Sequence, residues 1–278
     1  MKDLYDKVSI RCSEITTLTY STTFSIGIRC LAKELRAPIY SIYGFVRFAD
    51  EIVDTFHDYD KVDLLARFRD DTFRSIKDGI SLNPILNSFQ FTVRRYNIDH
   101  SLIEQFLRSM EMDLSIREYD KTALEEYILG SAEVVGLMCL QVFCHDRKKL
   151  HEALKSHAMH LGASFQKINF LRDLQGDFVG MGRTYFPGLD LNRFDEGSKK
   201  KIEESIKNDL DEGFKGIKRL PRSSRFGVYV AYVYYLALFK KIRNTPSEMI
   251  LNTRISIRKR HKATLLAYSY VKHQLNLI

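Results

Sequence analysis

The sequence uses little proline and glycine: 5 Pro and 14 Gly occur among its 278 residues. Glycine- and proline-rich spacers are absent, and so are low-complexity runs and recognisable repeats. Nothing therefore divides the chain into separate folding units. A chain of this length, 45% of it hydrophobic, can bury a substantial core. We expect one domain that spans residues 1–278.

Cysteine is also scarce, and its spacing excludes two common uses. The four cysteines form no CxxC pair and no other metal spacing, and no signal peptide is recognised. We therefore expect reduced thiols in a cytoplasmic protein. No apolar stretch is expected to reach the ~18 to 20 residues of a membrane span. The protein is expected to be soluble, or peripheral at the inner membrane surface.

A surplus of basic residues is present, but it is spread along the chain. The 43 basic and 35 acidic residues give a net charge of +8. The densest basic run consists of Arg254, Arg258, Lys259, Arg260 and Lys262. Such a run suits a solvated helix face, a diphosphate contact, or an anionic membrane, where each basic residue adds ~1 kcal/mol. Nucleic acid is not expected as a partner, because no recognised binding motif accompanies the charge.

Sustained period-2 alternation, which is typical of half-buried strands, is missing, whereas helical periodicity runs through nearly the whole chain. Ile39, Ile42 and Val46 recur at helical spacing, and Pro84 falls near the first turn of another helix. Further helices are predicted at residues 4–20, 36–57, 101–115, 122–144, 157–177, 195–216, 222–243 and 246–275. The pattern predicts an all-α protein, a helical bundle around a central cavity.

The most informative feature is a pair of acidic helical segments, residues 47–54 and 166–177. Each carries two aspartates four residues apart, among Val, Ile, Leu and Phe. Residues i and i+4 lie on one helix face, so each segment projects two carboxylates together. Carboxylates in an apolar helix are costly unless they are paired, hydrogen-bonded or metal-bound. Two such faces turned toward each other predict Mg²⁺, or Mn²⁺ in its place, shared with a substrate diphosphate.

A single Asp-x-x-x-Asp helix is also common on solvated surfaces, so the pattern alone is not specific. Here, however, Asp50 and Asp54 have apolar flanks. Arg47 lies one turn before Asp50, where it can grip a phosphate with two hydrogen bonds or neutralise the aspartates. The polar residues of the second segment share one helical stripe: they are Gln166, Asn169, Asp173 and Asp177. Together these details favour the metal–diphosphate interpretation.

Other polar and aromatic residues have more ordinary interpretations. Arg172 points away from the acidic stripe by helical geometry, and we assign it a structural ion pair. Because no zinc spacing is present, we expect surface positions for His57, His157 and His160. The tyrosines between 229 and 235 are more typical of a core, although aromatic rings in an apolar cavity can also stabilise a cation.

Taken in order, these motifs resemble those of the squalene/phytoene synthase family. The matching segments are Tyr20-Ser21-Thr22-Thr23-Phe24, Arg47 with Asp50 to Asp54, Tyr127 to Gly136, Gln166 to Asp177, and Arg183-Thr184-Tyr185-Phe186. They cover almost the whole chain, and two long motifs that agree together are specific. The overall likeness is greatest to bacterial phytoene synthases.

The resemblance implies an isoprenoid synthase fold and a two-step reaction. One prenyl diphosphate ionises with the help of Mg²⁺, and its allylic cation alkylates the double bond of a second. The resulting cyclopropylcarbinyl diphosphate ionises in turn and rearranges to a 1-1′ linked hydrocarbon. The residue pattern is consistent with this, because diphosphate departure needs concentrated positive charge and the carbocation needs a dry, apolar cavity.

The resemblance also implies roles for individual residues. Mg²⁺ would be held by Asp50, Asp54, Asp173 and Asp177, with Glu51 and Asn169 assisting. Diphosphate contacts, or the orientation of its ligands, would fall to Arg47, Gln166, Arg183, Tyr185, Tyr235 and Arg254. Tyr127 would face the reacting carbons, and Ser21 and Phe24 would belong to a flap that closes the cavity. Many relatives carry lysine where this chain has Thr22, which weakens the case for a phosphate contact there.

The preferred function is synthesis of phytoene from two molecules of geranylgeranyl diphosphate. Ile28 lies one turn after Phe24, and C30-forming relatives tend to have a bulkier aromatic there, so isoleucine leaves room for a C20 chain. One alternative is a C30 enzyme that makes dehydrosqualene or squalene from farnesyl diphosphate. Squalene formation would need NADPH, for which the chain has no glycine-rich fingerprint, and no NADPH is expected. A second alternative is a non-catalytic helical assembly factor, which should have lost its aspartates.

Overall fold

In the computed structural model the chain is an assembly of helices, and the structure describes residues 2–116, 118–176, 185–186 and 194–275. All regular elements of these residues are helical, which confirms the all-α prediction. The helices are α1 (Lys2–Tyr20), α2 (Thr22–Arg29), α3 (Lys33–Asp54), α4 (Lys61–Asp78), α5 (Pro84–Tyr96), α6 (His100–Ser115), α7 (Lys121–Ile128), the π-helix η1 (Leu129–Glu133), α8 (Val134–Phe143), α9 (Lys148–Gln175), α10 (Glu196–Ile217), α11 (Arg222–Arg243), α12 (Ser247–Ile250) and α13 (Lys259–Gln274).

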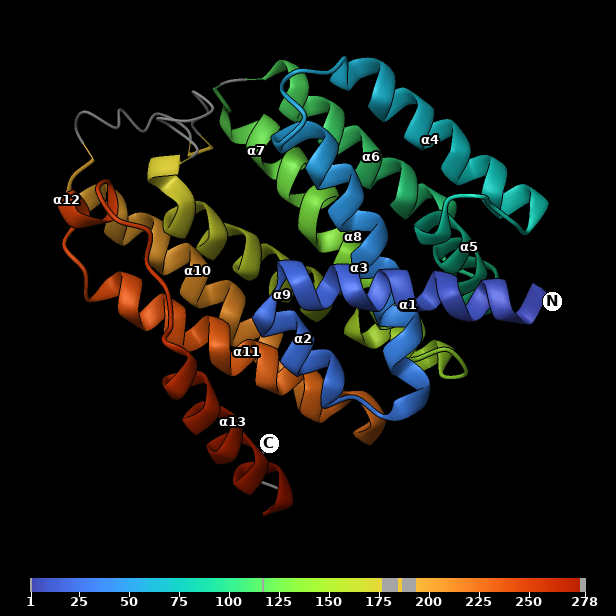
Figure 1. The fold of residues 1–278 in the computed structure, drawn as a ribbon. Coiled ribbons are helices and arrows are strands. Elements are labelled where there is room, and N and C mark those ends of the chain that lie inside the picture. The colour runs from blue at the N-terminus through green and yellow to red at the C-terminus, as the bar shows by residue number, and fades with distance from the viewer. Residues whose placement is uncertain (1, 117, 177–184, 187–193, 276–278) are drawn as a thin grey trace.

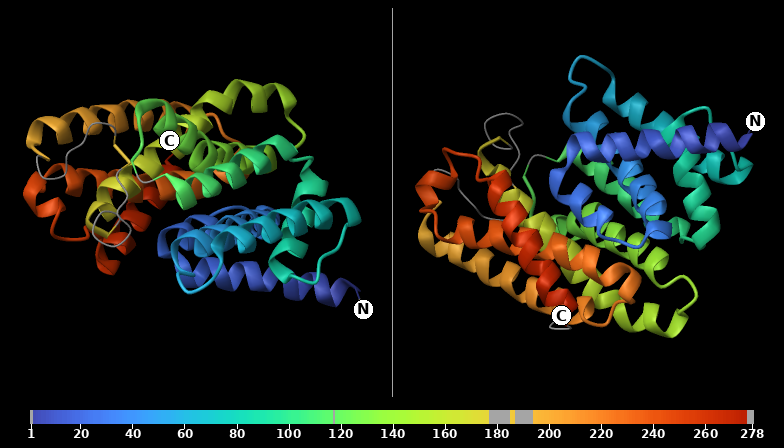
Figure 2. Two further views of the ribbon diagram at one scale, coloured as in Figure 1. Left: turned by 90° about the horizontal axis from the view of Figure 1, so that it is seen from above. Right: turned by 60° about the horizontal axis from the view of Figure 1, so that its bottom comes forward.

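The N-terminal and C-terminal helices form two groups that meet along the middle of the molecule (Figures 1 and 2). α1 packs on α3 and α5, while α9 packs on α10 and α8. Each group has its own hydrophobic cluster. The first includes Phe45, whose ring stacks on Phe89 with centroids 4.0 Å apart. The second includes Phe170, stacked on Tyr185 at 4.1 Å. The space between the clusters is where a ligand site can form.

Local sequence signals explain where many helices begin and end. The side chains of Asp60, Asn83 and Asp99 accept hydrogen bonds from the first-turn N–H groups of α4, α5 and α6. Pro84, at the start of α5, has the preset φ that suits a first helical position. At the other end of α4, Gly79 adopts a left-handed φ of 73°, which glycine tolerates without steric cost. These caps bring polar residues to the surface and leave the helix interiors to the core.

The segment Lys121–Phe143 corrects one expectation from the sequence. Its 23 residues are long and apolar enough to cross a membrane by length and composition, so the expectation that no stretch would reach this length is wrong. In the structure the segment comprises α7, η1 and α8 and runs through the centre of the molecule. It contacts α3, α6 and α9. Of its most apolar window, 39% is buried, and Val135, Cys139 and Phe143 line a cavity between the two clusters.

The predicted helix over residues 246–275 is also wrong in its middle part. It is two helices, α12 and α13, and the chain between them is not helical. Within this linker Ile255 is buried in the second cluster, and Arg254 reaches an aspartate of α9. These tertiary contacts outweigh the local helical periodicity.

The helices α2 and α4 were not among those predicted, and α9 begins nine residues earlier than expected, at Lys148.

Candidate active site

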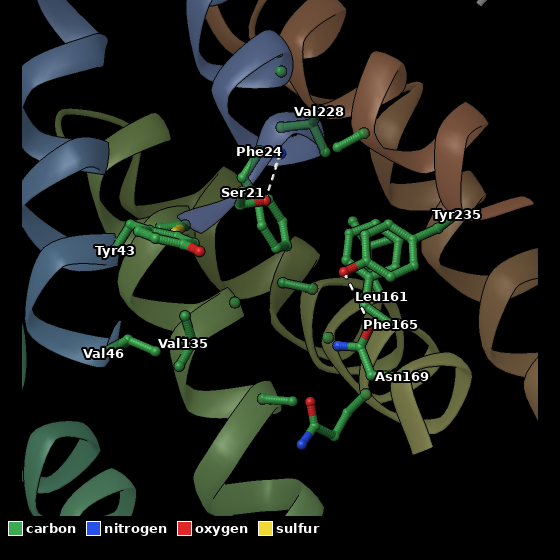
Figure 3. Close-up of a pocket in the computed structure, with 18 of the residues that line it drawn as sticks. Ser21, Phe24, Tyr43, Val46, Val135, Leu161, Phe165, Asn169, Val228 and Tyr235 are labelled. Atoms are coloured by element: carbon green, nitrogen blue, oxygen red, sulfur yellow. Dashed lines mark hydrogen bonds between the residues drawn. The ribbon is translucent and has the colours of Figure 1, made fainter. Parts of the chain in front are cut away.

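An elongated cavity of about 560 Å³ lies between the two clusters, lined chiefly by α2, α3, α8, α9 and α11 (Figure 3). Along α9 its lining runs from Leu154 to Asp173, roughly 28 Å at 1.5 Å per residue. The volume falls within the range of small-molecule sites, about 300 to 1,000 Å³. The cavity is therefore large enough for an extended apolar ligand.

Aromatic side chains form the middle of this cavity. The ring of Phe24 lies 5.8 Å from that of Tyr43 and 5.9 Å from that of Tyr235. Tyr235 in turn stacks on Phe165 at 3.9 Å (Figure 3). Burial raises the pKa of Tyr43 to about 12, so its hydroxyl stays neutral. Neutral ring faces in a dry cavity can stabilise a passing cation.

The mouth of the cavity is the end where its lining reaches Asp54 on α3 and Asp173 on α9. One wall of this mouth carries the first acidic segment, on α3. Arg47 donates from Nη1 to Asp50 Oδ2 at 3.0 Å and also pairs with Glu51. Its guanidinium lies 4.4 Å from the ring centroid of Tyr20. The Nε of Arg47 is buried and has no hydrogen-bond partner among the described residues. Arg47, Asp50 and Asp54 all line the cavity, so this wall offers both a guanidinium group and carboxylates to a ligand.

The opposite wall carries the second acidic segment, on α9. Asp173 pairs with Arg172 and accepts from Arg254 Nε at 2.7 Å. One turn earlier, Asn169 Oδ1 accepts from the Tyr235 hydroxyl at 3.4 Å. All these residues and Gln166 line the cavity. The prediction that Arg172 points away from the stripe is wrong: its long side chain folds back onto its neighbour, although it does form the predicted ion pair.

The oxygen donors at the mouth have the chemistry of a magnesium site. Carboxylates of Asp50, Asp54 and Asp173 and the amide oxygen of Asn169 are the hard ligands that Mg²⁺ prefers. Within the described ranges, no group of three or more His, Cys, Asp or Glu is arranged to hold a metal. Instead, arginines on each wall form ion pairs with the aspartates Asp50 and Asp173. The types of oxygen donor therefore fit Mg²⁺, although the described side chains are not arranged as a complete coordination shell.

Tyr127 lies on the cavity lining and belongs to a buried polar cluster that the sequence did not predict. Its hydroxyl donates to Asp113 Oδ2 at 2.6 Å. Tyr119 and Tyr185 donate to the other carboxylate oxygen, at 3.0 and 3.4 Å. Burial, followed by the negative charge of Asp113, raises the pKa of Tyr127 well above its ordinary value. The phenol therefore stays protonated beside the cavity.

The predicted flap is α2 with its N-cap. Ser21 caps this helix by accepting from the Phe24 N–H at 3.2 Å, and both residues line the cavity. Lys262, from α13, donates to the hydroxyls of Thr22 and Thr23 at 2.6 and 3.0 Å. Burial lowers the pKa of Lys262, and nearby Arg172 adds to the effect. A lysine from the far end of the chain thus supplies positive charge beside Thr22.

The remaining predicted residues have varied positions. Ile28 is buried and shares the cavity lining with Phe24, and the tyrosines between 229 and 235 are buried. Glu51 is not part of the lining. Asp177 and Arg183 lie outside the described residues.

The three histidines have different positions. The expected surface position of His157 is wrong, because this residue lines the cavity, whereas His57 is exposed. His160, half exposed, pairs with Asp209 at 2.8 Å.

Solved structures with the same fold include a dehydrosqualene synthase and a squalene synthase. A dehydrosqualene synthase superposes with a TM-score of 0.82 over 97% of this chain and 98% of its own, at 19% identity. The squalene synthase HpnC from Alicyclobacillus acidocaldarius gives a TM-score of 0.74 over 86% of this chain and 95% of its own, at 20% identity. At these identities the likeness establishes the fold.

Curated relatives are more similar in sequence. The chloroplastic phytoene synthase 1 of Solanum lycopersicum is 27% identical over 97% of this chain and 68% of its own length. The phytoene synthase of Mycobacterium tuberculosis is 28% identical over 66% of this chain and 59% of its length. A presqualene diphosphate synthase of Rhodopseudomonas palustris is 30% identical over 62% of this chain and 60% of its length. The chain thus spans about three fifths to two thirds of these relatives.

The sequence profile described as Squalene/phytoene synthase matches residues 18–261. The match includes both acidic segments, the flap and the linker that carries Arg254. Members of this family are head-to-head prenyltransferases and typically use Mg²⁺. Because the profile covers well over half of the sequence, the chain belongs to the squalene/phytoene synthase family.

Proposed function

We propose that this protein condenses two prenyl diphosphates head to head. The observation that carries the proposal is that one cavity has a charged part and an apolar part. Aspartates and arginines from α3, α9 and the α12–α13 linker meet at its mouth, and apolar and aromatic side chains line its interior. A ligand with a diphosphate head and a long hydrocarbon tail matches both parts.

The residues of the chain have distinct tasks in this reaction. Arg47, Arg172 and Arg254 hold the diphosphate, since guanidinium groups bind phosphate oxygens with paired hydrogen bonds. When bound, Mg²⁺ supplies further positive charge that stabilises the departing diphosphate. The apolar lining excludes water, which would otherwise quench a carbocation. The rings of Phe24 and Tyr235 face the interior, where they stabilise that cation.

For the substrate, we propose geranylgeranyl diphosphate, with phytoene as the product and no need for NADPH. Two observations support this choice. Ile28 leaves the cavity wall free of an aromatic ring at that position, and several of the curated relatives are phytoene synthases. The C30 alternative, farnesyl diphosphate, has support from the presqualene diphosphate synthase relative. An assembly factor without activity is disfavoured, because the aspartates and arginines of the mouth are retained.

Separate incubations with the two substrates test the proposal. Purified protein is mixed with Mg²⁺ and either geranylgeranyl or farnesyl diphosphate, and the hydrocarbons are identified by chromatography and mass spectrometry. A C40 hydrocarbon from the first substrate is the expected result. A product from farnesyl diphosphate alone would establish the C30 alternative, and no product from either would favour the assembly factor.

We also propose a cytoplasmic location, peripheral at the inner membrane surface. The support is α13, which lies at the edge of the molecule (Figure 1). It exposes Tyr268, Tyr270 and Val271 beside the basic Lys272. Tyrosines are enriched at membrane–water interfaces, and each basic residue near an anionic lipid surface adds ~1 kcal/mol. We expect the protein to co-sediment with anionic vesicles but not with zwitterionic vesicles. If it binds neither kind of vesicle, the peripheral membrane location is excluded.

A further inference from the structure

A buried carboxylate lies behind the cavity wall and outside the lining. Asp113, on α6, is only 3% exposed. It accepts hydrogen bonds from the hydroxyls of Tyr127 at 2.6 Å, Tyr119 at 3.0 Å and Tyr185 at 3.4 Å. A buried charge is costly unless it is well hydrogen-bonded. Tyr119 and Tyr127 follow Asp113 closely in sequence, whereas Tyr185 lies 72 residues away, so the fold brings all three donors to one carboxylate.

The direction of these hydrogen bonds determines what the tyrosines can offer to a ligand. Tyr127 and Tyr185 line the cavity, and their rings lie 5.3 Å apart. A phenol has a single proton to donate. The proton of Tyr127 goes to Asp113 at 2.6 Å, and Tyr185 also donates to this carboxylate, at 3.4 Å. Toward the cavity the two phenols therefore present oxygen lone pairs and ring faces, which attract a cation, rather than a proton donor.

We propose that Asp113 is a positioning residue for the condensation, one that fixes Tyr127 and Tyr185 with their electron-rich sides toward the reacting carbons. The inference rests on the proposed function. Asp113 does not touch the substrate, and it acts through the two phenols. Without it, the Tyr127 hydroxyl can rotate and point its proton into the cavity, where it would repel a carbocation.

The first test is Asp113→Asn, which keeps the size of the side chain but replaces one acceptor oxygen with a donor. At least one tyrosine hydroxyl then loses its partner. We expect kcat to fall roughly 100-fold, the typical effect of a misplaced reacting group, with KM for geranylgeranyl diphosphate changed less than threefold, about 0.6 kcal/mol. The matched control is Asp209→Asn. Asp209 is also buried and hydrogen-bonded, to His160 and Lys167, but it is not part of the cavity lining.

A double variant distinguishes positioning from a general loss of stability. Because Asp113 acts through the phenols, Asp113→Asn combined with Tyr127→Phe should be only slightly slower than Tyr127→Phe alone. Melting curves followed by circular dichroism check that each variant is folded at the assay temperature. Losses that multiply in the double variant, an unchanged kcat in Asp113→Asn, or an equal loss in Asp209→Asn would each overturn the proposal.

An ultraviolet titration of tyrosine ionisation gives a second readout that does not depend on activity. Removing the charge of Asp113 should move the ionisation of a buried tyrosine to lower pH, and the shift should be absent when Tyr127 is already phenylalanine. Titration curves that coincide for wild type and Asp113→Asn would overturn the coupling. If the wild type condenses no prenyl diphosphate, the proposed function fails, and this titration still decides whether Asp113 controls the phenols.

Discussion

At the scale of single residues, arginines explain how aspartates persist in apolar helices. Arg47 pairs with Asp50, while Arg172 and Arg254 pair with Asp173. Pairing offsets part of the cost of removing a carboxylate from water. The same guanidinium groups are the diphosphate ligands in the proposed reaction. The mouth therefore holds both the anions that suit a metal and the cations that suit the leaving group.

Removing one carboxylate should stop turnover without unfolding the protein. We expect Asp50→Asn and Asp173→Asn each to lower kcat about 10²- to 10³-fold or more, because a charge needed in the transition state is lost. Steady-state rates on geranylgeranyl diphosphate measure this effect, and far-ultraviolet circular dichroism should be unchanged. Asp63→Asn, at an exposed position of α4, is the control and should retain full activity. Wild-type rates in either test variant would rule out a role for these carboxylates in the reaction.

The size of residue 28 should set the preferred chain length. Ile28→Phe places a ring in the cavity wall, and overpacking typically costs ~1 to 3 kcal/mol. We expect kcat/KM to fall more for geranylgeranyl than for farnesyl diphosphate, about tenfold for each ~1.4 kcal/mol. Ile76→Phe, equally buried but away from the lining, controls for simple destabilisation. An equal loss on both substrates would remove Ile28 from the specificity argument.

Several site residues could be predicted from sequence because they obey helical spacing. Asp50 and Arg47 sit one turn apart on α3, and Asn169 and Asp173 sit one turn apart on α9. Asp113 and Lys262 gave no such signal. Their partners lie on other elements, and in the case of Lys262 and Thr22 at opposite ends of the chain. Contacts of this kind depend on tertiary packing, which periodicity does not encode.

At the scale of elements, close helix contacts position the wall that holds Tyr127. Gly130, in η1, faces α6 so closely that a Cβ at this position would lie 2.6 Å from the Gln105 carbonyl oxygen. A backbone atom cannot move aside as a flexible side chain would. π-helical turns are often found at functional sites, and this one begins two residues after Tyr127. Glycine at 130 therefore allows η1 and α6 to approach.

This contact predicts the effect of adding one methyl group. Gly130→Ala should lower the free energy of unfolding by ~1 to 3 kcal/mol, as overpacking does elsewhere. Gly176→Ala is the matched control, since a Cβ there meets nothing within 4 Å, and the change should be neutral or slightly stabilising. Urea unfolding followed by circular dichroism measures both. Equal stability of Gly130→Ala and wild type would show that the helices can separate at no cost.

Helix positions were largely predictable, and the errors have tertiary causes. The periodicity predicted α11 with its observed ends, Arg222 and Arg243. It failed between α12 and α13, where burial of Ile255 and the pairing of Arg254 hold the chain in a non-helical form. Local propensity is weak compared with such packing.

At the scale of the whole molecule, two hydrophobic clusters leave a cavity where they meet. Its position follows from the way α2, α3, α8, α9 and α11 pack together. The sequence predicted a cavity in an all-α bundle, but not which helices would line it, because helix pairing involves residues far apart in the chain. The sequence predicted that the two acidic segments face each other, and the fold places Asp50, Asp54 and Asp173 on the lining of one cavity.

The central claim is that this mouth and cavity together condense two prenyl diphosphates with a divalent cation. Its most direct test is the product formed from geranylgeranyl diphosphate by the purified chain, with Mg²⁺, with EDTA, and with Mg²⁺ plus NADPH. The account predicts a C40 hydrocarbon with Mg²⁺, no product with EDTA, recovery of the product when excess Mg²⁺ is restored, and the same hydrocarbon when NADPH is present. Undiminished turnover in EDTA, a reduced product with NADPH, or no condensation under any of these conditions would contradict it.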